Sequence, residues 1–164
     1  MDGGTIVGCR ATTYGGGIYN NGYVFMNGGR ILGCVSNYGG GAYTKGTFHL
    51  RGTASITDCT AKYGGGVYVC GEKTKCYLYL GGKAVVENNS SSNVYTAKNG
   101  WIRFEEQDAP AEGMKVGVTP SATNGKFTDG TALEDYVNYF FSDVAGKAPS
   151  FSKADLSLKK ASTR

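Results

Sequence analysis

The feature that most constrains this chain is a repeat of 25 residues. Cys9, Cys34 and Cys59 stand 25 residues apart, and each is followed within five residues by a Tyr-Gly-Gly-Gly segment. These three segments are residues 14–17, 38–41 and 63–66. A repeat of this length, rich in β-branched and aromatic residues, predicts a structural unit that buries its apolar face only by stacking on its neighbours.

The glycine content decides which kind of repeat this is. The chain of 164 residues contains 27 glycines, and glycine inside a helix costs about 0.5–1 kcal/mol relative to alanine. Three consecutive glycines in each repeat therefore argue against helical repeats, whereas tight corners between strands use the positive φ that glycine adopts. The repeat predicts a parallel β-helix with three short strands per coil, and its four coils are residues 2–26, 27–50, 51–80 and 81–104.

One strand of each coil is recognisable as a closing strand. These closing strands are residues 23–26, 47–50, 77–80 and 101–104. A period of two places every second side chain in the interior. The residues predicted to point inward are Val24, Met26, Phe48, Leu50, Leu78, Leu80, Ile102 and Phe104. Because neighbouring coils lie about 4.8 Å apart, equivalent residues should form ladders. We predict an interior ladder of Ile6, Ile31, Ile56 and Val85, and a stack of Tyr19, Tyr43, Tyr68 and Tyr95.

The repeat also resembles a known family. Gly-Gly-Thr-Ile at 3–6, the Gly-Gly-Gly corners that end in tyrosine, and an aromatic strand that ends in Met-Asn-Gly-Gly at 26–29 carry the resemblance. Together they resemble the right-handed parallel β-helix repeats of large bacterial cell-surface, adhesin-like proteins of the pectin-lyase-like superfold. The resemblance covers residues 2–104 and extends to about residue 144. That family usually has asparagine where this chain has Cys9, Cys34 and Cys59, and we align Asn88 with those positions.

The resemblance implies an all-β fold, a right-handed parallel β-helix of about four coils with a C-terminal cap that contains a short helix and strands. We expect the coils at residues 1–104, the cap at 105–146, and a tail at 147–164 that adds one last strand. The short helix is expected over residues 132–143, and residues beyond 160 are expected to fray.

The function implied is that of a noncatalytic structural or adhesive segment of a bacterial surface or secreted protein, hence extracellular. The alternative is a degenerate or partial carbohydrate-active domain, because many members of this superfold cleave acidic polysaccharides with clustered carboxylates. Acidic residues are few in the coils, and Asp58 and Glu87 lack a third partner. His49 is the single histidine and has no partner at a recognisable spacing. We therefore expect no enzyme activity, no catalytic residues and no cofactor.

The outward positions of the closing strands are the candidate binding surface. They form two columns, Tyr23, Thr47, Tyr77, Trp101 and Phe25, His49, Tyr79, Arg103. An aromatic face suits the C–H surface of a sugar or a protein partner. The candidate binding residues are therefore Tyr23, Phe25, Tyr77, Tyr79, Trp101 and Arg103. The alternative is that the helix expected over 132–143 covers this surface.

The cysteines fall into two groups. Cys9, Cys34 and Cys59 share one coil position, so we expect a ladder of buried thiols, since three thiols in a row lack the convergence of a tetrahedral metal site. Cys70 and Cys76 flank an insertion, residues 71–75. If that insertion is a hairpin, the two cysteines can form a disulfide, which would favour an extracellular setting.

Charge and hydropathy limit the other partners. The formal net charge is +4, and the basic residues are scattered over different coil positions, so nucleic acid is not an expected partner. No apolar run is long enough to span a bilayer, and the chain shows no signal peptide. Met1-Asp2-Gly3-Gly4 aligns with Met26-Asn27-Gly28-Gly29, which suggests that Met1 is an internal methionine of a longer protein. The open edge of the first coil then favours self-association.

Overall fold

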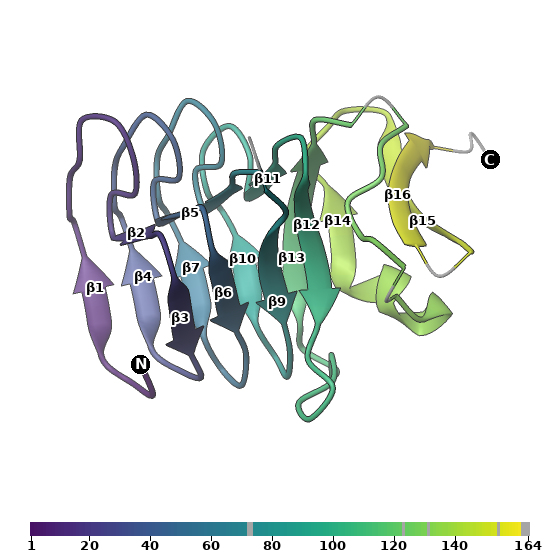
Figure 1. Ribbon diagram of the computed structural model, residues 1–164, viewed down its shortest axis with the longest axis horizontal. Coiled ribbons are helices and arrows are strands. Elements are labelled where there is room, and N and C mark those ends of the chain that lie inside the picture. Colours follow the sequence, from purple (N-terminus) through teal and green to yellow (C-terminus); the bar gives the residue numbers. More distant parts are fainter. Residues whose placement is uncertain (72–73, 123, 131, 154, 162–164) are drawn as a thin grey trace.

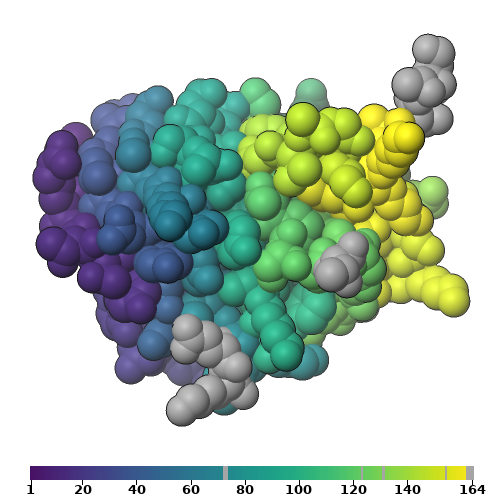
Figure 2. Space-filling model, turned by 90° about the horizontal axis from the view of Figure 1, so that it is seen from above, coloured from purple at the N-terminus to yellow at the C-terminus, as the bar shows by residue number. Residues whose placement is uncertain are grey.

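The protein is a parallel β-solenoid of about five turns. The computed structural model describes residues 1–71, 74–122, 124–130, 132–153 and 155–161. Successive coils follow one another along the long axis in sequence order, from purple at one end to yellow at the other (Figures 1 and 2). The fold class predicted from the repeat is confirmed, with about five turns in place of the four expected.

Each of the first four coils contributes three strands, one to each side of the solenoid (Figure 1). The first side holds β1 (Thr5–Val7), β4 (Arg30–Leu32), β7 (Ser55–Thr57) and β10 (Val85–Glu87). The second side holds β2 (Ile18–Asn20), β5 (Ala42–Thr44), β8 (Val67–Val69) and β11 (Val94–Thr96). The third side holds the closing strands β3 (Tyr23–Met26), β6 (Thr47–Leu50), β9 (Cys76–Leu80) and β12 (Gly100–Phe104). All neighbouring strands on a side pair in parallel.

A longer strand, β13 (Lys115–Pro120), begins the fifth turn and joins two sides into one sheet. Its first residues pair with β10 and its last residues pair with β11. After β13 come a 3₁₀ helix, η1 (Glu134–Tyr139), the strand β14 (Phe140–Ser142), which pairs with β13, and an antiparallel hairpin of β15 (Lys147–Ser152) and β16 (Asp155–Lys160). The helix expected over 132–143 is thus shorter, because its last residues continue the sheet as β14.

The alternation predicted for the closing strands is confirmed. Met26, Phe48, Leu50, Leu78, Leu80 and Ile102 are fully buried in one continuous core. Val24 is only half-buried, because it belongs to the first coil and has a neighbouring coil on one side only. Phe127, Phe140 and Leu156 close the other end of this core.

The interior ladder on the first side runs through Ile6, Ile31 and Ile56 as predicted, but it continues to Val86. The prediction of Val85 was wrong by one residue, since Val85 pairs with Ser55 and Val86 is fully buried. Two adjacent valines look alike in the sequence. Only the register of the neighbouring coil decides which of them faces the core.

The same shift of one residue applies to the asparagine aligned with the cysteines. Asn89, and not Asn88, takes the cysteine position. The Nδ2 of Asn89 donates to the carbonyl of Ile56 (3.0 Å), just as the Sγ of Cys59 contacts the carbonyl of Ile31 (3.9 Å). Asn88 instead has a φ of 58° and takes the left-handed turn position that Gly33 and Asp58 occupy in the preceding coils.

The predicted tyrosine stack is confirmed on the second side. Tyr19, Tyr43, Tyr68 and Tyr95 stack nearly parallel, with ring centroids 5.2–5.5 Å apart. Beside it runs a second column of Tyr14, Tyr38 and Tyr63, from the first position of each Tyr-Gly-Gly-Gly segment. The two columns touch, since the rings of Tyr14 and Tyr43 are 4.6 Å apart.

Met1 occupies the same coil position as Met26. The backbone N–H of Asn27 donates to the carbonyl of Met1 (2.8 Å), and that of Arg51 donates to the carbonyl of Met26 (2.9 Å). The alignment of Met1-Asp2 with Met26-Asn27 is thereby confirmed, and the Nδ2 of Asn27 also bonds to the carboxylate of Asp2.

Candidate functional site

The two outward columns predicted from the sequence exist. Tyr23, Thr47, Tyr77 and Trp101 align across β3, β6, β9 and β12, and Phe25, His49, Tyr79 and Arg103 align beside them. The six candidate residues nevertheless do not form one surface. Tyr23 and Phe25, at the open end of the first coil, are 76% and 46% exposed, whereas Tyr77, Tyr79, Trp101 and Arg103 are half-buried.

The aromatic rings of the second column stand on edge. Phe25 and His49 stack with centroids 4.4 Å apart, and His49 and Tyr79 stack at 4.7 Å, with interplanar angles of 14° and 15°. Stacking occupies both faces of His49, so only ring edges point outward along the middle of the column. This column therefore does not present a flat aromatic surface on which a sugar ring could stack. Stacking contacts with a ligand are left to the rings at its ends.

The carboxylate of Glu105 contacts the middle of this column. The Nδ1 of His49 lies 2.5 Å from the Oε1 of Glu105, and the Nη1 of Arg51 lies 3.6 Å from the Oε2 of the same carboxylate. The sequence did not reveal this partner of His49. Glu105 follows β12 directly. Its backbone N–H donates to the carbonyl of Leu80, just as the N–H of Gly81 donates to the carbonyl of Leu50 in the preceding coil. Glu105 therefore aligns with Gly81 in the preceding coil and with Arg51 in the coil before that. This alignment is the sequence signal from which the contact between Glu105 and His49 could have been predicted.

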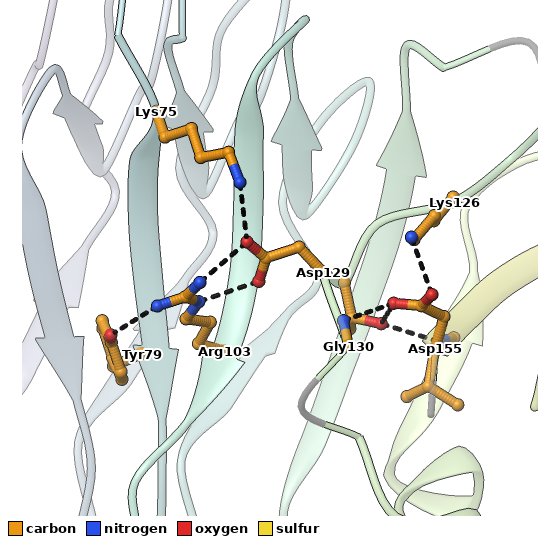
Figure 3. Close-up of polar contacts among 9 residues, drawn as sticks. Lys75, Tyr79, Arg103, Lys126, Asp129, Gly130 and Asp155 are labelled. Carbon is orange, nitrogen blue, oxygen red and sulfur yellow. Dashed lines mark hydrogen bonds and ion pairs between the residues drawn. The ribbon is translucent and has the colours of Figure 1, made fainter. Parts of the chain in front are cut away.

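Arg103 is held by Asp129 and Tyr79 (Figure 3). Its Nε and Nη2 donate to the two carboxylate oxygens of Asp129, at 2.8 and 2.9 Å, and its Nη1 lies 3.4 Å from the hydroxyl of Tyr79. Lys75 also reaches Asp129 (3.5 Å). The hydrogen bonds with Asp129 raise the pKa of Arg103 above its usual value. The guanidinium also covers the ring of Tyr77, 4.2 Å from its centroid.

A cavity of about 520 Å³ opens where this column meets the segment after β12. Its lining comprises Tyr79, Arg103, Phe104, Glu105, Glu106, Gln107, Ala109, Leu133 and Tyr136. The expected helix thus borders the end of the candidate surface through Leu133 and Tyr136, and Tyr136 packs on Phe104 at 4.6 Å. It leaves Tyr23 and Phe25 exposed, so the hypothesis that it covers the whole surface is wrong.

Two of the charged side chains that line this cavity are paired with opposite charges. Among the described residues, its lining contains one basic residue, Arg103, and two acidic residues, Glu105 and Glu106. Arg103 pairs with Asp129 and Glu105 with Arg51, and both of these partners lie outside the lining. Asp129 and Glu105 are each held by two or more partners. The cavity therefore combines aromatic walls with planar polar groups that their partners already orient.

The cysteine ladder holds at two of its three positions. Cys34 and Cys59 are buried, while Cys9 is exposed because the first coil has no neighbour on its outer side. Burial raises the pKa of Cys59 to about 11. Cys70 and Cys76 are both buried and carry free thiols here, and the Sγ of Cys76 lies 3.0 Å from the carbonyl of Lys45. Residues 72–73 of the insertion between them lie outside the described part, so the hairpin stays a prediction.

Within the described ranges, no group of three or more histidine, cysteine, aspartate or glutamate residues is arranged to hold a metal ion. None of the helical segments described has the length and apolarity needed to cross a membrane. Comparisons with family models, curated proteins and solved structures give no match. The fold and the geometry of the 520 Å³ cavity therefore carry the functional argument.

Proposed function

We propose that this chain is a noncatalytic, adhesive segment of a cell-surface or secreted protein and that it binds a neutral carbohydrate in the cavity beside Arg103. The observation that carries the proposal is the combination of aromatic and planar polar side chains in one cavity of about 520 Å³. This volume lies within the range of small-molecule sites, which are typically apolar with a few placed polar groups.

Sugar rings present an apolar C–H surface and a rim of hydroxyl groups, and both find partners here. Tyr79, Phe104 and Tyr136 offer aromatic surface. Glu106 and Gln107 are exposed at the cavity and offer hydrogen bonds. Arg103 and Glu105 are already paired with opposite charges, so they attract an ionic ligand less than unpaired groups would.

The remainder of the solenoid supports a structural role. The first four coils pair with one another along three sides, so the cavity is mounted on a rigid stack of strands. The repeat resembles those of bacterial surface proteins, which is the support for an extracellular location.

Binding of a panel of neutral oligosaccharides, oligomers of glucose, galactose, mannose and N-acetylglucosamine, tests the proposal by calorimetry. We expect binding of at least one of them, lost or weakened about tenfold or more in Tyr136→Ala and Glu106→Gln. Tyr23→Ala is the matched control, because Tyr23 lies at the open end of the same face. Loss of binding in Tyr23→Ala but not in Tyr136→Ala would refute the cavity as the site.

One observation favours a second candidate, a carbohydrate-active site. Glu105 and Glu106 both line the cavity, and hydrolysis of glycosides uses two carboxyl groups about 5–9.5 Å apart. Both oxygens of Glu105 are already paired with His49 and Arg51, which favours a structural role for that carboxylate. Release of reducing ends from the same oligosaccharides, abolished in Glu106→Gln, would establish the second candidate.

A further inference from the structure

A second cavity, of about 390 Å³, lies at the start of β12 and shares no residue with the first. Its walls include Thr96, Lys98, Asn99, Trp101, Ser121 and Lys126. No aspartate or glutamate is among the described residues that line it. The described lining of this cavity is therefore basic and hydrogen-bonding, whereas the lining beside Arg103 contains two glutamates.

The indole of Trp101 carries an unmet hydrogen-bond donor. Its Nε1 is buried and has no hydrogen-bond partner within the described part of the chain. The indole N–H donates only, so its partner must be an acceptor. Because a buried donor without a partner is unfavourable, a ligand that brings an acceptor gains from this contact.

Two ammonium groups lie at the same cavity. Lys126 stands over the ring of Trp101, 5.7 Å from its centroid, and pairs with Asp155 at 2.7 Å (Figure 3). Lys98 is exposed in a tight turn, which the N–H of Gly100 closes by donating to the carbonyl of Ala97 (2.9 Å). Both lysines line the cavity, and the turn fixes the backbone at Lys98 while the ion pair fixes the ammonium of Lys126.

We propose that this cavity binds a small oxyanion, a carboxylate, sulfate or phosphate group. The oxyanion accepts a hydrogen bond from the Trp101 indole and is held by charge-assisted hydrogen bonds from Lys98 and Lys126. This site is independent of the carbohydrate site proposed above, since the two share no lining residue and one is proposed for a neutral ligand and the other for an anion.

Trp101 is the single tryptophan of the chain, so its fluorescence reports on this cavity directly. The titrants are acetate, sulfate and phosphate at an ionic strength kept constant with sodium chloride, and acetamide serves as the neutral analogue of acetate. We expect a saturable change in emission with at least one oxyanion and none with acetamide. The same oxyanion should shift the proton resonance of the indole N–H, which places it at that donor.

Two variants of equal charge change complete the test. Lys98→Gln should weaken oxyanion binding roughly three- to tenfold. Lys83→Gln should leave it unchanged, because Lys83 is exposed and lines neither cavity. The proposal is overturned if none of the three oxyanions gives a saturable change, if acetamide acts like acetate, or if the two variants behave alike. None of these measurements involves a sugar, so a negative result refutes the oxyanion site without bearing on the proposed carbohydrate site.

Discussion

The contact between His49 and Glu105, with 2.5 Å between Nδ1 and Oε1, joins residues that lie 56 positions apart in the chain. Glu105 reaches back because Gly81, its neighbour in the preceding coil, has no side chain. A Cβ atom on Gly81 would lie 2.8 Å from the Cγ of Glu105 and 2.3 Å from the carbonyl oxygen of Asp108. The missing side chain of one coil thus makes room for a contact across two coils.

Glu105→Ala should lower the free energy of unfolding by about 1–3 kcal/mol, because His49 and Arg51 lose their shared partner in a half-buried position. Glu106→Ala is the control, since Glu106 is exposed, and should change stability by less than about 0.5 kcal/mol. Urea unfolding of both variants provides the measurement. Equal losses in the two variants would show that the contact with His49 contributes nothing.

The Gly-Gly-Gly corners make a second prediction possible. A Cβ atom on Gly40 would lie 2.5 Å from the carbonyl oxygen of Gly65 and 2.6 Å from that of Thr60, both in the next coil. Backbone atoms cannot yield as a side chain can, so Gly40→Ala should destabilise the solenoid by about 3 kcal/mol or more. Gly22→Ala meets nothing within 4 Å and should be neutral or slightly stabilising. Thermal unfolding compares them, and a neutral Gly40→Ala would contradict the close approach of the coils.

The sequence predicted the coils and their inward residues because periods of 2 and 25 residues act together. The inward residues of β6 and β9 follow directly from that pattern. The predicted register was wrong by one residue at Val86 and Asn89. Each of them is preceded by a residue of the same type, so the sequence does not show which of the two faces the core. It also missed the partners of His49 and Arg103, since Glu105 and Asp129 follow the last closing strand, where the repeat no longer constrains their place.

The cysteines should differ sharply in reactivity. Cys9 is exposed, whereas Cys34, Cys59, Cys70 and Cys76 are buried. Since alkylation requires the thiolate, the raised pKa of Cys59, about 11, protects it further. Iodoacetamide at pH 8 should modify Cys9 alone within minutes, and the others only after unfolding in urea. Mass spectrometry of the peptides measures this, and rapid labelling of Cys59 in the folded protein would contradict its burial.

The open end of the first coil should mediate self-association. β1, β2 and β3 each lie at the end of a row of paired strands in the described chain, and Val7 there is 61% exposed. Unpaired strand edges recruit further strands unless a charge opposes it. We expect sedimentation equilibrium to show association that Val7→Lys reduces and Leu133→Lys, at the other end, does not. A monomer at all concentrations, or equal effects of the two lysines, would refute this role.

The attachment of the C-terminal segment depends on Asp143. Its carboxylate accepts hydrogen bonds from the backbone N–H of Asn93 (2.7 Å) and from the Nδ2 of Asn93 (2.6 Å), and the Oδ1 of Asn93 accepts one from the N–H of Asn89 (2.9 Å). Asp143→Ala should cost about 1–3 kcal/mol, because two donors of the buried Asn93 lose their partner.

The cost of Asp143→Ala should also depend on pH. Burial raises the pKa of Asp143 above its ordinary value of 3.8, so the folded protein holds this proton more tightly than the unfolded chain does. The contribution of Asp143 to stability is therefore largest below pH 3.8 and falls as the pH rises through the raised pKa. The difference in unfolding free energy between the wild type and Asp143→Ala should accordingly be larger at pH 3.5 than at pH 7. A difference that grows with pH would mean that the ionised carboxylate, and not the protonated one, is the form that folding favours.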